Sequence, residues 1–433
     1  MRSRISCACE VDKLGKSSYK NGKPLFSYKN TVQVPPLGMI DDIVAATECE
    51  SDTFDSITTN AVINKFIESK KLEFGPEKCH QLHVGSASIK NRKCQTLRVH
   101  GDEMKRVEKE KYVGDILNSS GCYEQNIEER RKRGFGSISE ILSILREVPL
   151  GQYRLQVGLK LRESMFLGAI LCNSEVWYLP NDNVLSKLEE VDEHLLRQLL
   201  SAQATVSRAA LYLETAATPI CFLVKSRRLM YLHHILSRSN EELIRKVFEA
   251  QKRKTVKNDW VNIIKRDCAD VKITFSESQI MSLKKYKFKA IVKERIQNSA
   301  FDYLIGIKEN QSKLKEIKYK KFETQKYLMS NELSNEEKFI LFRIRTRTID
   351  DIKTNFRNKY GKDLRCRFED SEEESQSHQF VCPYIVEECD ELRKNKDVKY
   401  EDFFGNIEAQ IPATRLYKKI LEARQKLLKA IED

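Results

Sequence analysis

The spacing of apolar residues changes along the chain and separates two kinds of structure. Up to about residue 121, short apolar runs alternate with turn residues, as between Thr31 and Ala45, a pattern typical of β-strands. From about Tyr123 to Tyr360, Leu and Ile recur at helical spacing among Lys, Glu and Arg, and three prolines interrupt the pattern: Pro149, Pro180 and Pro219. The pattern predicts an α+β protein that is mainly α.

Changes in composition divide the chain further. We predict a small domain of strands with one or two helices over residues 1–121, and two helical regions over residues 122–240 and 241–363. Residues 364–433 form a terminal module with an acidic run, a Cys/His stretch and a predicted helix from about Thr414 to Ile431.

Charge narrows the classes of partner. The chain has 76 Lys and Arg against 63 Asp and Glu, a net charge of +13, which favours a partner that carries phosphates. No run approaches the roughly 18 to 20 apolar residues of a membrane span, and we expect no membrane partner. The first residues lack a secretory signal, so we expect the twelve cysteines to lie in a reducing intracellular compartment, with nucleus and cytoplasm not distinguished.

Two adjacent carboxylates interrupt the apolar strands of the first domain. Met39 and Ile40 lead into Asp41 and Asp42, and a further apolar run follows, so the pair is predicted at the tip of a tight hairpin. Like charges this close are costly unless a cation neutralises them, and Mg²⁺ is the natural candidate. A solvated surface turn is the usual alternative for an arbitrary Asp-Asp pair.

Four segments in this order resemble the motifs of reverse transcriptases of non-LTR (LINE-like) retrotransposons. Residues 36–42, Pro-Leu-Gly-Met-Ile-Asp-Asp, resemble the third catalytic motif, with methionine in place of the aromatic residue. Residues 72–78 resemble the motif that follows it, and Lys-Tyr-Val-Gly at 111–114 resembles the primer-grip hairpin. Residues 170–177 resemble the thumb signature Tyr-Gly-x-Glu-x-Trp, with Asn173 in place of the glycine.

The resemblance implies a partial reverse-transcriptase palm over residues 1–121, a thumb from residue 122 and a helical connector. It implies an RNA-directed DNA polymerase, a nucleotidyltransferase of a transposable element, with RNA and DNA as template and primer. Asp41 and Asp42 would be catalytic ligands of magnesium, and Lys78 would act on the leaving phosphate. The residues that would bind nucleic acid are Tyr112, Gly114, Arg130, Arg131, Lys132 and Arg133.

The resemblance also implies an incomplete catalytic site. The family's first motif supplies another essential aspartate far upstream of the hairpin, whereas 40 residues precede Asp41 here and their one aspartate, Asp12, has a polar setting. We therefore expect a fragment that does not polymerise DNA alone and keeps affinity for template and primer. Two alternatives stay open: a domesticated basic helical scaffold that binds RNA or DNA, and a polymerase subunit completed by a partner that supplies the missing half.

Basic runs recur through the helical regions. The run Arg130-Arg-Lys-Arg precedes a thumb-like helix, and others occur at 252–254, 284–285 and 318–321. Phosphate contact is the functional interpretation, and a solvated helical face is the usual alternative for any one run.

The terminal module contains candidate metal ligands. Cys366, His378 and Cys382 resemble the Cys-Cys-His-Cys knuckle that closes many of these polyproteins, but the second cysteine is missing, with Phe368 in its neighbourhood. Cys389 is the substitute for the fourth ligand. Zinc prefers four nitrogen or sulfur ligands, so a zinc site and a degenerate knuckle are both open.

Overall fold

The structure is a computed structural model. It describes backbone and side chains for residues 79–84, 102–120, 123–177, 183–253, 259–349, 365–368 and 372–431. For residues 182 and 432 and the segments 4–9, 19–20, 23–24, 37–39, 42–46 and 98–99 it describes the backbone. Asp41 and the whole segment 72–78, which includes Lys78, lie outside the described residues.

The described strands all precede residue 119, as the alternating pattern predicts. Five of them form one mixed sheet in the order β4-β5-β1-β6-β9, in which β4 and β5 are antiparallel and the other pairs are parallel. Short antiparallel pairs join β2 to β3, β7 to β8, and β10 to β11. The strands are β1 (Arg4–Cys9), β2 (Tyr19–Lys20), β3 (Lys23–Pro24), β4 (Leu37–Met39), β5 (Asp42–Ala46), β6 (His80–His83), β7 (Arg98–Val99), β8 (Asp102–Glu103), β9 (Lys105–Val107), β10 (Lys109–Tyr112) and β11 (Asp115–Asn118).

Helices account for most of the chain after residue 123, so the protein is mainly α, as expected. The α-helices are α3 (Glu124–Glu147), α4 (Arg154–Leu161), α5 (Leu167–Leu171), α6 (Ser186–Leu200), α7 (Arg208–Thr215), α8 (Ile220–Leu236), α9 (Leu243–Arg253), α10 (Trp260–Asp270), α11 (Glu277–Ser282), α12 (Lys285–Glu309), α13 (Lys326–Met329), α14 (Asn335–Arg345), α16 (Pro383–Glu388), α17 (Asp390–Lys394) and α18 (Ile407–Glu432). Shorter helical turns are η2 (Gly151–Tyr153), η3 (Arg162–Phe166), η4 (Ser174–Val176), η5 (Asp182–Leu185), η6 (Ser312–Leu314), η7 (His378–Phe380) and η8 (Tyr400–Phe404). Among the described residues, no helix combines the length and the apolarity needed to cross a membrane.

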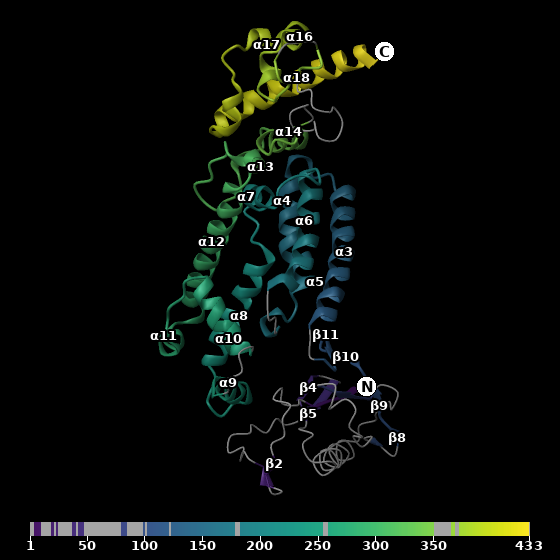
Figure 1. The fold of residues 1–433 in the computed structure, drawn as a ribbon, viewed down its shortest axis with the longest axis vertical. Coiled ribbons are helices and arrows are strands. Elements are labelled where there is room, and N and C mark those ends of the chain that lie inside the picture. The colour runs from purple at the N-terminus through teal and green to yellow at the C-terminus, as the bar shows by residue number, and fades with distance from the viewer. Residues whose placement is uncertain are drawn as a thin grey trace.

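The helices form an elongated body, with the labelled strands at one end and α16 to α18 at the other (Figure 1). On one side α3 packs against α5 and α6, and on the other α12 packs against α7 and α8. The close approach of α3 requires Gly134, because a Cβ there would lie 3.0 Å from side-chain carbons of both Ile170 and Val191.

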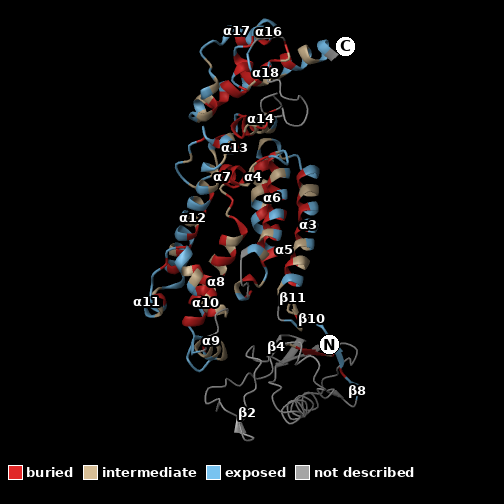
Figure 2. Cartoon of the chain, viewed as in Figure 1, coloured by how far each residue is buried: buried red, intermediate tan, exposed pale blue. Residues whose placement is uncertain are grey.

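Buried apolar side chains form two clusters. The larger cluster joins α3 to α7 with α14 and α18, and the smaller one joins α8, α10 and α12. Buried residues therefore recur in every layer of the body, whereas exposed residues cover the outer faces of α12 and α11 (Figure 2). The predicted boundaries near residues 121, 240 and 363 stay predictions.

Helix α18 begins earlier than the predicted start near Thr414. It starts at Ile407 and includes Pro412. Asn406 sets this start, because its Oδ1 accepts a hydrogen bond from the Ala409 amide at 3.0 Å, as an N-cap residue does. The proline therefore lies in the second turn of the helix and does not end it.

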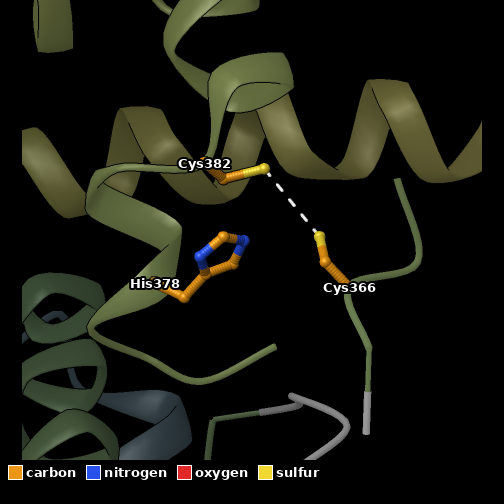
Figure 3. Close-up of side chains that lie close together, drawn as sticks. All are labelled: Cys366, His378 and Cys382. Atoms are coloured by element: carbon orange, nitrogen blue, oxygen red, sulfur yellow. Dashed lines mark hydrogen bonds between the residues drawn. The ribbon is translucent and has the colours of Figure 1, made fainter. Parts of the chain in front are cut away.

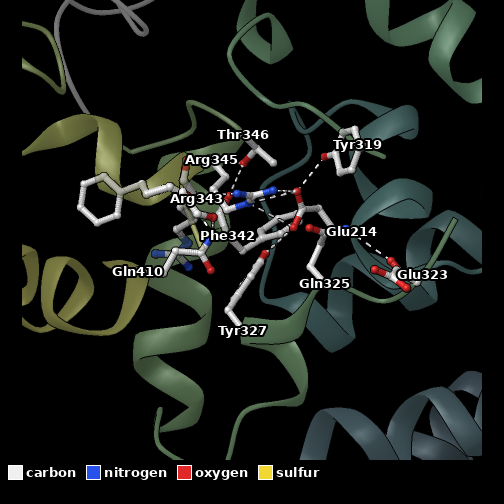
Figure 4. A network of polar contacts seen from close by, with 12 residues as sticks. Glu214, Tyr319, Glu323, Gln325, Tyr327, Phe342, Arg343, Arg345, Thr346 and Gln410 are labelled. Atoms are coloured by element: carbon white, nitrogen blue, oxygen red, sulfur yellow. Dashed lines mark hydrogen bonds and ion pairs between the residues drawn. The ribbon is translucent and has the colours of Figure 1, made fainter. Parts of the chain in front are cut away.

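A buried carboxylate joins α7 to the segments that follow α12. Glu214 has no exposed surface, and Arg345 from α14 donates to its carboxylate at 3.0 Å (Figure 4). The hydroxyls of Tyr319 and Tyr327 donate to the same carboxylate at 2.6 and 2.8 Å, and Arg345 also donates to the Phe403 carbonyl. One charge from the first helical region thus holds three later segments.

This network predicts a specific loss of stability in alkali. Burial, followed by the negative charge of Glu214, raises the pKa of Tyr327 well above its usual value of 10. The folded chain therefore holds this proton more tightly than the unfolded chain, so the stabilisation is complete below pH 10 and is lost as the pH rises above 10. We expect Tyr327→Phe to cost about 1 to 2 kcal/mol at pH 8 and to lose less stability than the parent above pH 10.

The measurement is the midpoint of urea unfolding, monitored by circular dichroism at pH values from 8 to 11. The control is Tyr286→Phe, because Tyr286 is 64% exposed. Equal alkaline losses in the parent and Tyr327→Phe would contradict the assignment.

Candidate functional site

A strained two-residue turn connects β10 to β11. Tyr112 pairs with Asp115, and the residues between them, Val113 and Gly114, have φ angles of 46° and 88°. Two positive φ angles define the type I′ turn that suits a hairpin, and glycine adopts such a conformation freely. A β-branched residue does so only under strain, and strain of this kind persists where surrounding contacts hold it. The contacts that hold Val113 in this conformation therefore bear on the role of the turn.

Arg130 of α3 forms hydrogen bonds to the turn. Its guanidinium donates to the Gly114 carbonyl at 3.1 Å and to Asp115 Oδ1 at 2.8 Å, and it reaches the Ala169 carbonyl at 3.4 Å. Asn126 donates to the same Asp115 oxygen at 3.1 Å. Arg130 is 1% exposed and its guanidinium is bonded to the turn, whereas its contact with phosphate stays a prediction.

Asn173 holds the turn from the end of α5. Its φ angle is 61°, and its side-chain amide donates to the Val113 carbonyl at 2.9 Å. Asparagine is the residue after glycine that best tolerates this left-handed conformation. Four residues on, Trp177 has no exposed surface and anchors the segment. Sequence reasoning missed the contact between this segment and the turn, although an asparagine in a glycine position signals a positive φ angle.

The other predicted nucleic-acid residues lie nearer the surface. Arg131 pairs with Glu128 at 3.2 Å, Arg133 pairs with Glu129 at 3.7 Å, and Lys132 is exposed. Such exposed pairs contribute little to stability and exchange readily for other partners. Tyr112 and Gly114 are partly exposed at the turn. The structure thus places a partly accessible turn at the start of a helix that carries Arg131, Lys132 and Arg133 at its surface, beside Glu128 and Glu129.

The predicted hairpin around the two aspartates is described in part. β4 and β5 are antiparallel, with Met39 opposite Asp42 and two residues between them. Asp41 lies in that connection and, like the side chain of Asp42 and all of Lys78, it is outside the described residues. The strand pairing is the one expected of a tight hairpin, and the metal ligands are not tested by it.

Three of the four predicted zinc ligands meet in the terminal module. The side chains of Cys366, His378 and Cys382 are buried, and their ligand atoms all lie within 4.8 Å of one another (Figure 3). The Cys366 and Cys382 sulfurs are 3.9 Å apart. Cys389 is buried as well but does not belong to the group, so it is not brought together with the others.

The spacing of the two sulfurs fits a tetrahedral metal. With Zn–S bonds of about 2.3 Å, two thiolates on one zinc ion lie about 3.8 Å apart. The hydrogen bond to Cys382, followed by burial, raises the pKa of the Cys366 thiol, so at neutral pH this sulfur keeps its proton unless a metal displaces it. Phe368 is buried near the position of the absent second cysteine. Among the described residues, three candidate ligands for such a metal therefore lie together.

Ion pairs hold the ligand-bearing loop against α18. Glu374 is 1% exposed and accepts hydrogen bonds from Arg367 at 2.6 Å and from Arg424 of α18 at 2.7 Å. Burial alone would raise the pKa of Glu374, but these two arginines outweigh it and lower the pKa. Tyr417 of α18 donates to Gln379 at 2.6 Å, next to His378. These contacts thus hold the loop that carries the candidate ligands against α18.

Comparison with known proteins gives no relative. No protein-family model, no curated protein and no solved structure matches the chain.

The contact between Asn173 and the turn leads to a paired prediction. Asn173→Ala loses the hydrogen bond to Val113 and leaves alanine at a φ of 61°, a conformation that alanine adopts only under strain. We therefore expect the free energy of unfolding to fall by about 2 kcal/mol. Asn173→Gly loses the bond but accepts the conformation, and we expect about 1 kcal/mol. Urea midpoints of both variants test this, and equal losses would show that backbone strain has no part in the site.

Proposed function

We propose that the chain is part of a reverse transcriptase of the non-LTR retroelement class, and that the β10–β11 turn and the surface of α3 bind a template–primer duplex. One observation carries this proposal: the bond from Asn173 to Val113 joins two segments, 60 residues apart, that resemble the thumb signature and the primer grip of this class. Two segments that separately resemble motifs of this class are thus in contact.

Two details of the backbone support the same proposal. Asn173 stands where the thumb signature has glycine, and its φ of 61° is a conformation that glycine adopts freely. Val113 is strained at the tip of the hairpin, and strained residues cluster at ligand-binding sites. A primer grip has to hold one backbone geometry, and both of these details fit that requirement.

The proposed catalytic residues rest on the sequence. Antiparallel pairing of β4 with β5 supports a hairpin that presents Asp41 and Asp42 for magnesium. Magnesium bound there would supply the Lewis-acid chemistry of nucleotide transfer. The two other hypotheses, a domesticated scaffold and a subunit completed by a partner, share the same nucleic-acid surface, and a copurifying partner that restores primer extension would select the last.

Binding of an RNA–DNA hybrid tests the proposal. The variant Arg131→Gln/Lys132→Gln/Arg133→Gln removes three surface charges of α3 and keeps side chains of similar helix propensity. Each lost phosphate contact lowers the slope of log K against log salt by about 0.9, so we expect a slope smaller by about 2 to 3 and weaker binding at every salt concentration.

The matched control is Lys394→Gln/Lys396→Gln/Lys429→Gln, which changes the net charge equally at exposed positions of the terminal module. Fluorescence anisotropy with a labelled hybrid of about 20 base pairs, from 50 to 300 mM KCl, measures both variants. An unmodified chain without salt-dependent affinity would refute the proposed function, and equal slopes in the two variants would remove α3 from it.

A second proposal concerns the terminal module, which we infer binds zinc through Cys366, His378 and Cys382. The sulfur spacing of 3.9 Å carries it. We expect about one zinc ion per chain in protein purified without a metal-affinity tag, and loss of that zinc in Cys366→Ser. Cys389→Ser is the control, because Cys389 lies outside the group. Elemental analysis measures the content, and a metal-free parent protein would end the proposal.

A further inference from the structure

The first part of α12 and the residue before it carry a concentration of positive charge. The ten residues 284–293 include Lys284, Lys285, Lys287, Lys289 and Lys293 and no acidic residue. All five lysines, here named the lysine row, are exposed. The apolar residues between them, such as Phe288 and Val292, are buried against the smaller core. One face of the helix therefore serves packing, and the remaining surface is basic.

The lysines follow a regular spacing. Lys285, Lys289 and Lys293 recur every four residues, so their side chains lie along one side of the helix and span about 12 Å. Tyr286 lies beside them and is 64% exposed. A tyrosine in this position offers both a hydroxyl donor and an aromatic face.

Helix stability does not explain this arrangement. Positive charges in the first turns oppose the helix dipole, and like charges four residues apart repel each other. Some lysines elsewhere in the fold form ion pairs: Lys225 pairs with Asp270 at 2.7 Å and Lys252 pairs with Glu277 at 2.8 Å. Within the part of the chain that the structure describes, no ion pair involves a member of the lysine row. The charge is thus left for something outside the chain.

The end of α8 adds to the same positive region. His234 is exposed and stacks on Tyr231, with ring centres 5.9 Å apart. Burial, followed by the charges of Arg238 and Lys285, lowers the pKa of His234, which places these two cations near the same ring. Glu242 opposes this shift and pairs with Arg238 at 3.8 Å, so among the described residues Lys285 is the unpaired cation that acts on His234.

We propose that the lysine row, with Tyr286, binds the sugar-phosphate backbone of a nucleic acid as a second contact surface. The inference rests on the proposed function and adds a surface to it. α3 and α12 lie on opposite sides of the helical body, so this surface is separate from the one on α3 (Figure 1). A duplex carries one negative charge per about 1.7 Å with both strands counted, or one per about 3.4 Å of each strand, so a 12 Å row runs beside about three or four phosphates of one strand. Most phosphate contacts come from lysine and arginine side chains, with tyrosine hydroxyls among the others.

The packing of α12 favours nucleic acid over an anionic membrane. A helix that lies on a membrane inserts its apolar face into the lipid. The apolar face of α12, with Phe288, Val292 and Ile296, is buried against neighbouring helices. A surface that offers charge and one tyrosine suits a phosphate backbone better than a lipid interior.

The test is Lys285→Gln/Lys289→Gln/Lys293→Gln in the full chain, since glutamine matches lysine in helix propensity. The control is again Lys394→Gln/Lys396→Gln/Lys429→Gln, and equal circular dichroism and thermal midpoints confirm that both fold. By anisotropy with the RNA–DNA hybrid, we expect a salt slope smaller by about 2 to 3 and binding weaker by about tenfold or more at 150 mM KCl, with the control unchanged.

The outcomes separate this inference from the proposed function. If the lysine-row variant has the slope of the control while the α3 variant is impaired, the second surface is refuted and the proposed function stands. If the unmodified chain does not bind the hybrid, both are refuted. Sedimentation with vesicles of phosphatidylserine and phosphatidylcholine tests a membrane as the alternative partner. If the lysine-row variant loses binding to these vesicles but keeps its affinity for the hybrid, the surface binds a membrane and the proposal is overturned.

Discussion

Buried arginine–carboxylate pairs are the constraint on which the helical body depends. An arginine keeps its charge at any ordinary pH, so one that leaves water must meet a carboxylate in a fixed geometry. The pairs join residues separated by 15 positions in the shortest case and by 131 in the longest. Each pair fixes the place of one segment against another. Five such pairs lie among the described residues: Arg130 with Asp115, Arg162 with Asp192, Arg228 with Asp267, Arg345 with Glu214, and Arg424 with Glu374.

The same pairs explain why the sequence predicted the fold better than the site. Strands before residue 121 and helices after Tyr123 follow from the spacing of apolar residues, which is local, and Pro219 lies directly before α8 as a helix breaker should. Arg130 and Arg131 are neighbours in one basic run, yet the first is buried and the second lies at the surface. Which side of α3 faces the turn depends on tertiary packing, and a run of charges carries no information about it.

The terminal cluster shows a similar limit. His378 and Cys382 are four residues apart, so a single helical turn brings them together, and that part of the site was predictable. Cys366 joins them because Glu374 ties its loop to Arg424 of α18, a contact that spacing does not reveal. Cys389 has the right chemistry and lies beyond α16, outside the group. The residue types of the cluster could be named from the sequence, and the loop decides which of them lie together.

Arginine and lysine therefore divide the positive charge of this protein between two tasks. The buried arginines contribute to the net charge of +13 but are neutralised locally, so they add little to the field outside. The electrostatic field at the surface comes from cations that are not paired with a buried carboxylate. The exposed lysines of α12 are such cations. Lysine suits this task because its ammonium group remains strongly hydrated on a flexible stem and meets a phosphate without a fixed geometry. Burial rather than charge alone thus distinguishes the cations that hold the fold together from those that face the solvent.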